Sequence, residues 1–278
     1  MGKVFMKVYD SDSRDDGIRS TFLALWNYRD VVRVLVKRDL TVRYKRSLLG
    51  LLWTLLNPLL TSLVLWFVFI TIFSARLPDG TQFAPYVLSG VLMVTFFVQG
   101  FNQSADAIAN GAGLLTKVFV PPQVFAFSGA ISNAINFVLG LFALSFICVI
   151  TGNGVSLLAP LTVIPILCML MYVTGLGLLI SISYIRFDDT RNIVAVIVSF
   201  MMYLSPIFYP KEILNEKVLL VVNANPLTSY LDVFRFVFTN TGVATSLDWA
   251  YMLGTSTLFF VIGIRVFSRA WPRTVVML

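Results

Sequence analysis

The fold is decided by one uncharged stretch, VFVPPQVFAFSGAISNAINFVLGLFALSFICVITGNGVSLLAPLTVIPILCMLMYVTGLGLLISISYI, which occupies residues 118–185. It contains no Asp, Glu, Lys or Arg. A single helix of this length, at about 1.5 Å per residue, would far exceed a hydrocarbon layer of roughly 30 Å, so the stretch must fold back. The sequence Thr-Gly-Asn-Gly at 151–154 predicts the turn, which leaves membrane spans at 124–150 and 157–185.

Apolar segments on both sides of this stretch extend the pattern to six spans. The other four are predicted at residues 48–73, 86–105, 192–209 and 249–267. The composition agrees, because 13% of the residues are charged, whereas a soluble domain carries about 25%. We therefore expect an all-α integral membrane protein. Residues 48–278 form one six-helix transmembrane domain, and residues 1–47 form a cytoplasmic tail and an interface helix.

An amphipathic helix is predicted at 26–43, just before the first span. Its helical wheel separates an apolar side from a basic side: Val31, Val32 and Leu35 against Arg29, Arg33 and Lys37. Asp39 falls on the apolar side, one turn before Arg43. An internal ion pair with Arg43 or a protein partner must therefore compensate this carboxylate.

The segment at 210–247, between spans five and six, contains two apolar pieces that are too short to cross the membrane. They lie at 218–222 and 227–238, on either side of Asn225-Pro226. We expect two short re-entrant or interfacial helices here. They form an outer gate, or they are interfacial helices without a gating role, and the residues alone favour neither.

The distribution of basic residues sets the orientation. Of the 21 Lys and Arg residues, 17 fall on the side of the N-terminus and four on the other side. The positive-inside rule then predicts a multi-pass plasma membrane protein with both termini in the cytoplasm. The same rule accounts for the net charge of +7 without nucleic-acid binding.

The sequence offers little catalytic chemistry. It contains no His, and its two cysteines, Cys148 and Cys168, lie in apolar spans, so no metal site is expected. The nearest approach to a phosphate-binding loop, at 111–117, lacks the second glycine and the hydroxyl after Lys117. Asp188-Asp189 admits an alternative, a membrane enzyme acting on polyprenyl phosphates, although a charged turn is the favoured interpretation.

The interiors of the spans carry neutral polar residues but no charges, which argues against an ion-coupled carrier and for a pathway powered from outside. We interpret most of them as interhelical hydrogen-bonding residues. They are Asn57, Thr61, Ser62, Thr71, Gln99, Asn102, Asn133, Asn136, Ser181, Ser183, Ser199 and Ser205.

Two features, one within the first span and one just before it, suggest that this region binds a ligand. Its aromatic residues, Trp53, Trp66 and Phe69 among them, are suited to stacking on sugar rings, or they face lipid. The cationic cluster Arg43-Tyr-Lys45-Arg46 lies at headgroup level, where it binds a lipid diphosphate or only anchors the topology.

Three motifs resemble the membrane subunit of ABC-type polysaccharide exporters, the family that handles O-antigen, teichoic acid, capsule and mycobacterial galactan. The first and longest is KRDLTVRYKRSLLGLLWTLLNP at 37–58. YLSPIFYP at 203–210 and NPLTSY at 225–230 follow in the same order, so the resemblance covers nearly the whole chain.

The resemblance implies a homodimer joined to two copies of a separate ATPase, which binds the ATP and Mg²⁺, while this chain binds no cofactor. The dimer would export a polyprenyl-diphosphate-linked polysaccharide, and an exporter of drugs or lipids is the alternative. Spans one and five would line the channel, through Trp53, Trp66, Phe69, Tyr203 and Phe208. The ATPase would rest on Arg33, Lys37, Asp39 and the connection that contains Lys117.

Overall fold

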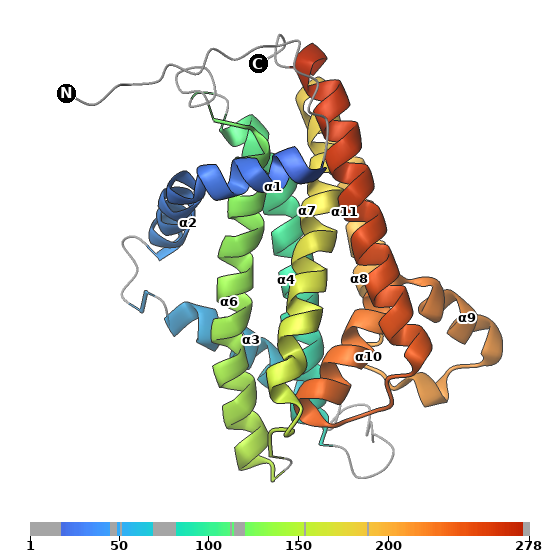
Figure 1. The fold of residues 1–278 in the computed structure, drawn as a ribbon. Coiled ribbons are helices and arrows are strands. Elements are labelled where there is room, and N and C mark those ends of the chain that lie inside the picture. The colour runs from blue at the N-terminus through green and yellow to red at the C-terminus, as the bar shows by residue number, and fades with distance from the viewer. Residues whose placement is uncertain are drawn as a thin grey trace.

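The computed structural model describes residues 18–44, 49–50, 52–68, 82–111, 113, 120–152, 154–187 and 189–274. The elements assigned in these ranges are helices (Figure 1). Four of the described helical segments are long and apolar enough to cross a membrane. They are α4 (Phe83–Asn110), α6 (Gln123–Ile150), Ala159–Arg186, which comprises η3 (Ala159–Thr162) and α7 (Val163–Arg186), and α11 (Ser246–Thr274).

These four segments contain the predicted spans at 86–105, 124–150 and 249–267 and nearly all of that at 157–185. The turn predicted at 151–154 is present, with Gly152 and Gly154 at φ +78° and +66°, a conformation that glycine adopts without steric cost. The predicted first and fifth spans coincide with shorter helices, α3 (Leu52–Phe67) and α8 (Asp189–Leu204), of 16 residues each. At about 1.5 Å per residue, 16 residues cover about 24 Å, less than the hydrocarbon thickness.

The N-terminal region contains two helices rather than the single helix predicted at 26–43. α1 (Ile18–Asn27) is followed at Tyr28 by α2 (Arg29–Tyr44). The apolar side of α2 packs on protein: Leu35 is 3% exposed and clusters with Val124 and Phe125 at the start of α6. α1 and the C-terminal part of α11 lie at the same end of the molecule (Figure 1).

α4 lies at the centre of the bundle and packs on both α6 and α7. Aromatic rings connect this core. Phe97 of α4 stacks on Tyr172 of α7 at 5.8 Å between centroids, and Tyr172 stacks on Tyr230 at 5.5 Å. α7 and α11 approach closely because Gly175 faces Gly263, and a Cβ at Gly263 would collide with the carbonyl oxygen of Gly175.

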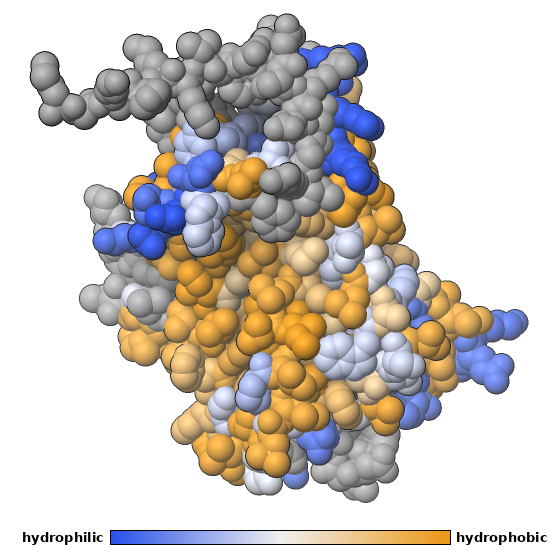
Figure 2. Space-filling model, in the orientation of Figure 1, coloured by the Kyte–Doolittle hydropathy of each residue, from blue (hydrophilic) through white to orange (hydrophobic). Residues whose placement is uncertain are grey.

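The segment between α8 and α11 contains η4 (Lys211–Ile213), α9 (Glu216–Ala224) and α10 (Pro226–Thr239). Asn225 starts α10, because its side chain accepts a hydrogen bond from the Leu227 amide at 3.2 Å and Pro226 needs no amide partner. Most of α10 is buried against protein, whereas α9 is largely exposed. The surface over the middle of the bundle is apolar, and hydrophilic residues gather toward its ends (Figure 2).

Candidate functional site

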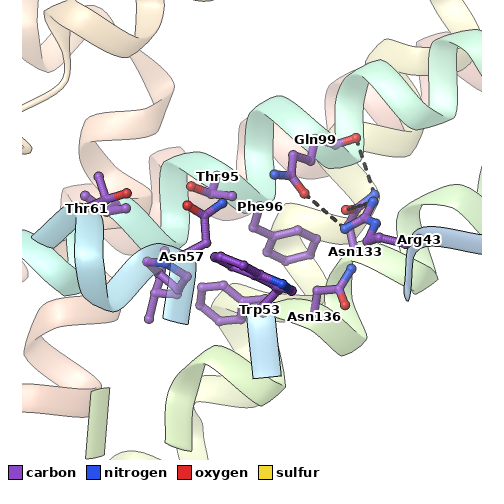
Figure 3. Close-up of a pocket in the computed structure, with 13 residues that line it drawn as sticks. Arg43, Trp53, Asn57, Thr61, Thr95, Phe96, Gln99, Asn133 and Asn136 are labelled. Carbon is purple, nitrogen blue, oxygen red and sulfur yellow. Dashed lines mark hydrogen bonds between the residues drawn. The ribbon is translucent and has the colours of Figure 1, made fainter. Parts of the chain in front are cut away.

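A cavity of about 490 Å³ lies beside the bundle core, between α3, α4 and α6, with the end of α2 at its rim (Figure 3). Its volume falls within the roughly 300–1,000 Å³ of small-molecule sites. Trp53, Asn57 and Thr61 follow i, i+4, i+8 spacing on α3, and this places them on one helical face directed into the cavity. The site is therefore built by three separate helices, with lining residues that extend from Arg43 to Phe137 in the sequence.

The lining combines apolar and polar groups and is nearly uncharged. Of the described residues that line the cavity, Arg43 carries the one charge. The remaining polar groups are amides and hydroxyls: Asn57, Thr61, Thr95, Gln99, Asn133 and Asn136. Five of these are among the neutral polar residues noted in the predicted spans, where we interpreted most such residues as helix-packing contacts. Their convergence on one cavity gives them a second role that their positions in the sequence did not reveal.

Aromatic rings form much of the apolar lining, beside Pro58, Val91 and Leu92. Trp53 enters from α3 and lies near Phe96 of α4 (Figure 3), and Phe96 is 5.2 Å from Phe137 of α6 between ring centroids. Rings beside amides and hydroxyls match the two kinds of surface on a sugar, its apolar faces and its hydroxyl groups. Phe96, Phe137 and Thr95 were missed from the sequence, because helical spacing alone does not distinguish them from core residues.

Arg43 is held at the rim by amide oxygens. Its Nη1 donates to Oε1 of Gln99 at 3.2 Å, and its Nη2 donates to Oε1 of Gln103 and Oδ1 of Asn133, both at 3.3 Å. Asn133 is 2% exposed and is itself fixed, because its Nδ2 donates to the carbonyl oxygen of Gly129 at 3.0 Å. Arg43, predicted to bind a lipid diphosphate, therefore lies in the same cavity as Trp53, which was predicted to contact sugar.

The other predicted ligand-binding residues are placed differently. Lys45, Arg46 and Phe69 lie outside the described residues, and Trp66 belongs to α3 with its side chain outside the described part. Tyr203 is 70% exposed on α8, and Phe208, half-buried, packs against the core. Within one protomer the cavity contains Trp53 but neither Tyr203 nor Phe208, so their place in a channel stays a prediction.

Among the predicted ATPase contacts, Arg33 and Lys37 lie exposed on α2, and Lys117 lies outside the described residues. Asp39 is 15% exposed. The ion pair considered between Asp39 and Arg43 is absent from the described structure: Asp39 instead accepts from Arg38 at 3.0 Å and from Nε2 of Gln103 at 3.4 Å. The i, i+4 spacing on α2 places Arg43 within reach of Asp39, but side chains from α4 and α6 accept the hydrogen bonds of its guanidinium instead.

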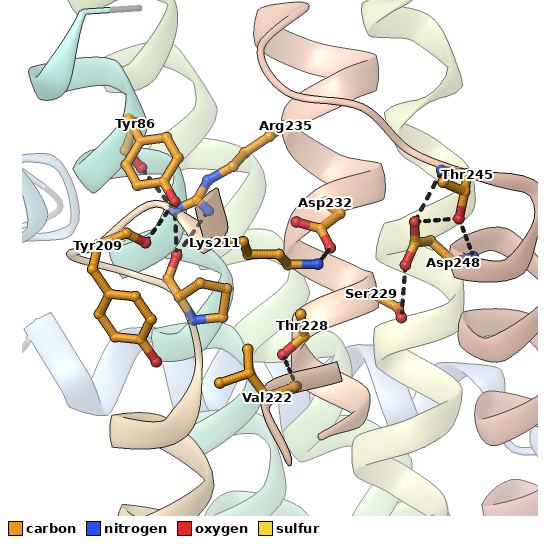
Figure 4. A network of polar contacts seen from close by, with 11 residues as sticks. Tyr86, Tyr209, Lys211, Val222, Thr228, Ser229, Asp232, Arg235, Thr245 and Asp248 are labelled. Atoms are coloured by element: carbon orange, nitrogen blue, oxygen red, sulfur yellow. Dashed lines mark hydrogen bonds and ion pairs between the residues drawn. The ribbon is translucent and has the colours of Figure 1, made fainter. Parts of the chain in front are cut away.

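A second polar network, which the sequence did not reveal, connects α10 to the start of α4 and the end of α8 (Figure 4). Its centre is Arg235, which is 3% exposed and lies 3.6 Å from the ring centroid of Tyr86. The guanidinium donates to the carbonyl oxygens of Pro206 at 2.8 Å and Tyr86 at 3.1 Å and to the hydroxyl of Ser89 at 3.2 Å.

One turn before Arg235 on α10, Asp232 forms an ion pair with Lys211 (Figure 4). Burial raises the pKa of the Asp232 carboxyl above its ordinary value, while the neighbouring Lys211 ammonium lowers it. Together with Arg235, this pair fixes α10 against the segment that follows α8.

The acidic pair considered for an enzyme gains no support in the described part of the chain. Asp188 lies outside the described residues, and Asp189 occupies the first turn of α8, where a carboxylate stabilises the helix dipole. The described residues contain no group of three metal-ligating side chains. Arg191 on α8 forms a 2.8 Å ion pair with Asp106 of α4 and lies 5.2 Å from the Tyr184 ring of α7.

Residues 30–239 match the ABC-2 type transporter family. The chain is 29% identical over 216 residues to the O-antigen export system permease protein RfbA of Myxococcus xanthus, covering 77% of this chain and 82% of the relative. It is 25% identical over 242 residues to RfbA of Klebsiella pneumoniae, covering 86% and 92%. It is also 25% identical over 259 residues to the capsule polysaccharide export inner-membrane protein CtrC of Neisseria meningitidis, covering 90% and 95%.

Proposed function

The chain belongs to the ABC-2 type transporter family, and we propose that it is the permease subunit of an ATP-driven exporter that moves a polysaccharide across the plasma membrane. It is a transporter subunit and not an enzyme, with ATP hydrolysis supplied by a separate subunit. The resemblance inferred from the motifs at 37–58, 203–210 and 225–230 is confirmed by the family match and the relatives.

The observation that carries the substrate class is the lining of the cavity between α3, α4 and α6. Six amides and hydroxyls stand among the apolar lining residues. A lipid tail would leave these polar groups unpaired, whereas the hydroxyls of a sugar pair with them. Sugar hydroxyls exchange hydrogen bonds with the amides while a ring face stacks on Trp53. The absence of a carboxylate among the described lining residues suits neutral sugars and anionic groups alike.

The polysaccharide is carried on a polyprenyl diphosphate, and Arg43 binds this anionic group. Its guanidinium reaches the cavity rim near one end of the bundle, and Lys45 and Arg46 follow within two to three residues in the sequence. Phosphate oxygens accept charge-assisted hydrogen bonds from guanidinium groups in bidentate geometry. The sugar then enters the cavity beyond Arg43, toward Trp53.

The energy comes from two copies of an ATPase that bind ATP and Mg²⁺. The cytoplasmic surface they rest on includes Arg33, Lys37, Asp39 and Lys117. Two observations support this surface: Arg33 and Lys37 are exposed, and α2 packs on α6, so that a push on α2 reaches the transmembrane helices directly.

The working unit is a homodimer of six-span chains with both termini in the cytoplasm. α3 and α8 form the first and fifth spans and line a channel between two copies. An exposed apolar face on α8 supports this arrangement; it comprises Ile193, Val196, Ile197, Phe200 and Tyr203. Trp66, Phe69, Tyr203 and Phe208 contact the glycan along the channel, and α9 and α10 close its outer end as a gate.

Replacing Trp53 by alanine tests the proposal. In vesicles that contain the permease and its ATPase, Trp53→Ala should reduce glycan export about two- to tenfold, because aromatic contacts contribute roughly 0.5–1.5 kcal/mol, while ATP hydrolysis continues. Phe142→Ala is the matched control, since Phe142 is 67% exposed on α6 and does not line the cavity.

Unchanged export in Trp53→Ala would refute the role of the cavity in transport. Export of glycan-free lipids or of small hydrophobic compounds by the wild-type complex would instead favour an exporter of drugs or lipids. Conversion of a lipid-linked sugar by the permease alone, with loss of activity in Asp189→Asn, would favour the enzyme.

A further inference from the structure

Two opposite charges stand one helical turn apart on α2 and do not pair. Asp39 and Arg43 have the i, i+4 spacing at which a carboxylate and a guanidinium ordinarily attract each other. In the described structure Asp39 instead accepts hydrogen bonds from Arg38, at 3.0 Å, on its exposed side. Arg43 turns into the cavity rim, where neutral amide oxygens accept all of its described hydrogen bonds.

Gln103 of α4 is the side chain that contacts both charges. Its Oε1 accepts from Nη2 of Arg43 at 3.3 Å, and its Nε2 donates to Oδ2 of Asp39 at 3.4 Å. The same Oε1 accepts from Nδ2 of Asn133, and this contact fixes the orientation of the amide. A primary amide is the side-chain group that offers an acceptor to a cation and a donor to an anion at once. Gln103 therefore satisfies both residues without bringing them together.

This arrangement preserves the charge of the cavity. Amide oxygens hold the guanidinium of Arg43 in place but carry no net charge, so they leave its positive charge uncancelled. A direct Asp39–Arg43 ion pair would cancel it. Since Arg43 is the one charged residue among the described residues that line the cavity, Gln103 decides whether the site is cationic or neutral.

We propose that Gln103 is a positioning residue that keeps Asp39 from neutralising Arg43 and so reserves the cationic rim for a phosphate group of the transported molecule. The inference rests on the proposed function and deepens it, because it names the residue that makes the site selective for a phosphate-bearing ligand. We assign this phosphate to a polyprenyl diphosphate; a membrane phospholipid presents the same chemical group, and the experiment separates the two sources.

The test measures lipid binding to the permease–ATPase complex in phosphatidylcholine nanodiscs. One set of nanodiscs contains undecaprenyl diphosphate and a second contains phosphatidylglycerol at the same mole fraction, and native mass spectrometry measures the bound lipid. Gln103→Ala lets Asp39 reach Arg43, so binding of undecaprenyl diphosphate should fall about tenfold, the equivalent of one charge-assisted hydrogen bond. Asn102→Ala, an exposed amide on the same helix, is the matched control.

The decisive variant is the double substitution Gln103→Ala/Asp39→Asn, measured against Asp39→Asn alone. Removing the carboxylate frees Arg43 again, so binding in the double variant should return to the level of Asp39→Asn. Gln103→Glu, which keeps the shape of the side chain, places a carboxylate directly on Arg43. It should weaken binding as much as Gln103→Ala, and Asp39→Asn should not restore it.

Four results overturn the inference. Unchanged binding in Gln103→Ala would show that Gln103 does not control the charge, and weakened binding that Asp39→Asn does not restore would reduce its role to packing. If phosphatidylglycerol binds as tightly as undecaprenyl diphosphate, and its binding also depends on Gln103, the cationic rim binds membrane phospholipid and not the transported molecule. A wild-type complex that binds neither lipid would refute the lipid-diphosphate part of the proposed function, and the inference with it. If the wild-type complex binds undecaprenyl diphosphate but Asp39→Asn does not restore binding to Gln103→Ala, only the inference is refuted.

Discussion

Replacing Arg235 by methionine should destabilise the protein, because this buried side chain connects three parts of the fold. Arg235 lies on α10, while its partners lie on α4 and in the segment after α8. Methionine has similar length and fills the space, but it donates no hydrogen bond. The variant therefore isolates the polar contribution of the guanidinium.

The size of the expected destabilisation depends on which hydrogen bonds each acceptor of Arg235 keeps in the variant. The Pro206 carbonyl keeps a hydrogen bond from the Tyr86 hydroxyl at 3.2 Å, and the Tyr86 carbonyl keeps one from Ser89 at 2.7 Å. Few acceptors therefore lose their only hydrogen-bond donor. The main losses are the charge-assisted hydrogen bonds and the cation–π contact with Tyr86. Such bonds contribute about 1.5–3 kcal/mol each and the contact about 2 kcal/mol, offset by relief from burying a charge. We expect a net loss of about 2–4 kcal/mol.

For a chain of this size the loss corresponds to a fall in Tm of about 5–15 °C, measured by thermal unfolding of the purified permease in detergent. Arg235→Lys should lie between wild type and Arg235→Met, since an ammonium keeps the charge but cannot reproduce the fork of donors. Arg269→Met is the control, because Arg269 is exposed on α11. A Tm for Arg235→Met within about 2 °C of wild type would refute the structural role assigned to the guanidinium.

Two further pairs of substitutions, each a test and its control, probe how the helices pack. Gly263→Val should separate α7 from α11 and cost about 1–3 kcal/mol or more, lowering the Tm or the yield of folded protein, whereas Gly254→Ala, with open space around its Cα, should leave the Tm equal or slightly raised. Equal Tm values for these two variants would contradict the close approach of Gly175 and Gly263. Asn225→Ala removes the cap of α10 and the hydrogen bonds to Met201 and Ser205, so it should cost about 2 kcal/mol, against about 1 kcal/mol for Asn215→Ala, which removes only the exposed cap of α9. The reverse order of the two Tm values would show that the bonds from Asn225 to the end of α8 add no stability.

The elements were largely predictable because local properties determine them. Uncharged apolar runs must form helices in lipid, where every backbone amide needs an internal partner, and the glycines at 152 and 154 allow the turn that divides the longest run. The break at Tyr28 was missed, since α1 and α2 together keep an apolar side and differ only in direction. Four helical segments in the described ranges are long and apolar enough to cross a membrane, and the status of α3 and α8 as spans belongs to the proposed dimer.

The candidate site was predictable only in part. Arg43 and Trp53 stood out because the cationic cluster at 43–46 directly precedes a span rich in aromatic residues. Their meeting in one cavity was not visible, since the packing of α2 on α6 and of α3 on α4 and α6 is not encoded in any periodicity. Arg235 looked like an ordinary charge outside the membrane, yet the fold buries it, because α10 packs into the bundle instead of lying on its surface.

The sequence by itself determined that the chain is helical and lies in the membrane, and its motifs placed it in its family. Hydropathy and charge act over a few residues, so they can be read in order along the chain. The tertiary structure alone decided which polar groups meet. Asp39 and Arg43 are neighbours by helical spacing, but Gln103, more than fifty residues away in the sequence, lies between their charges. A contact across helices therefore overrides the local attraction, and with it the structure decides whether the rim of the cavity is cationic.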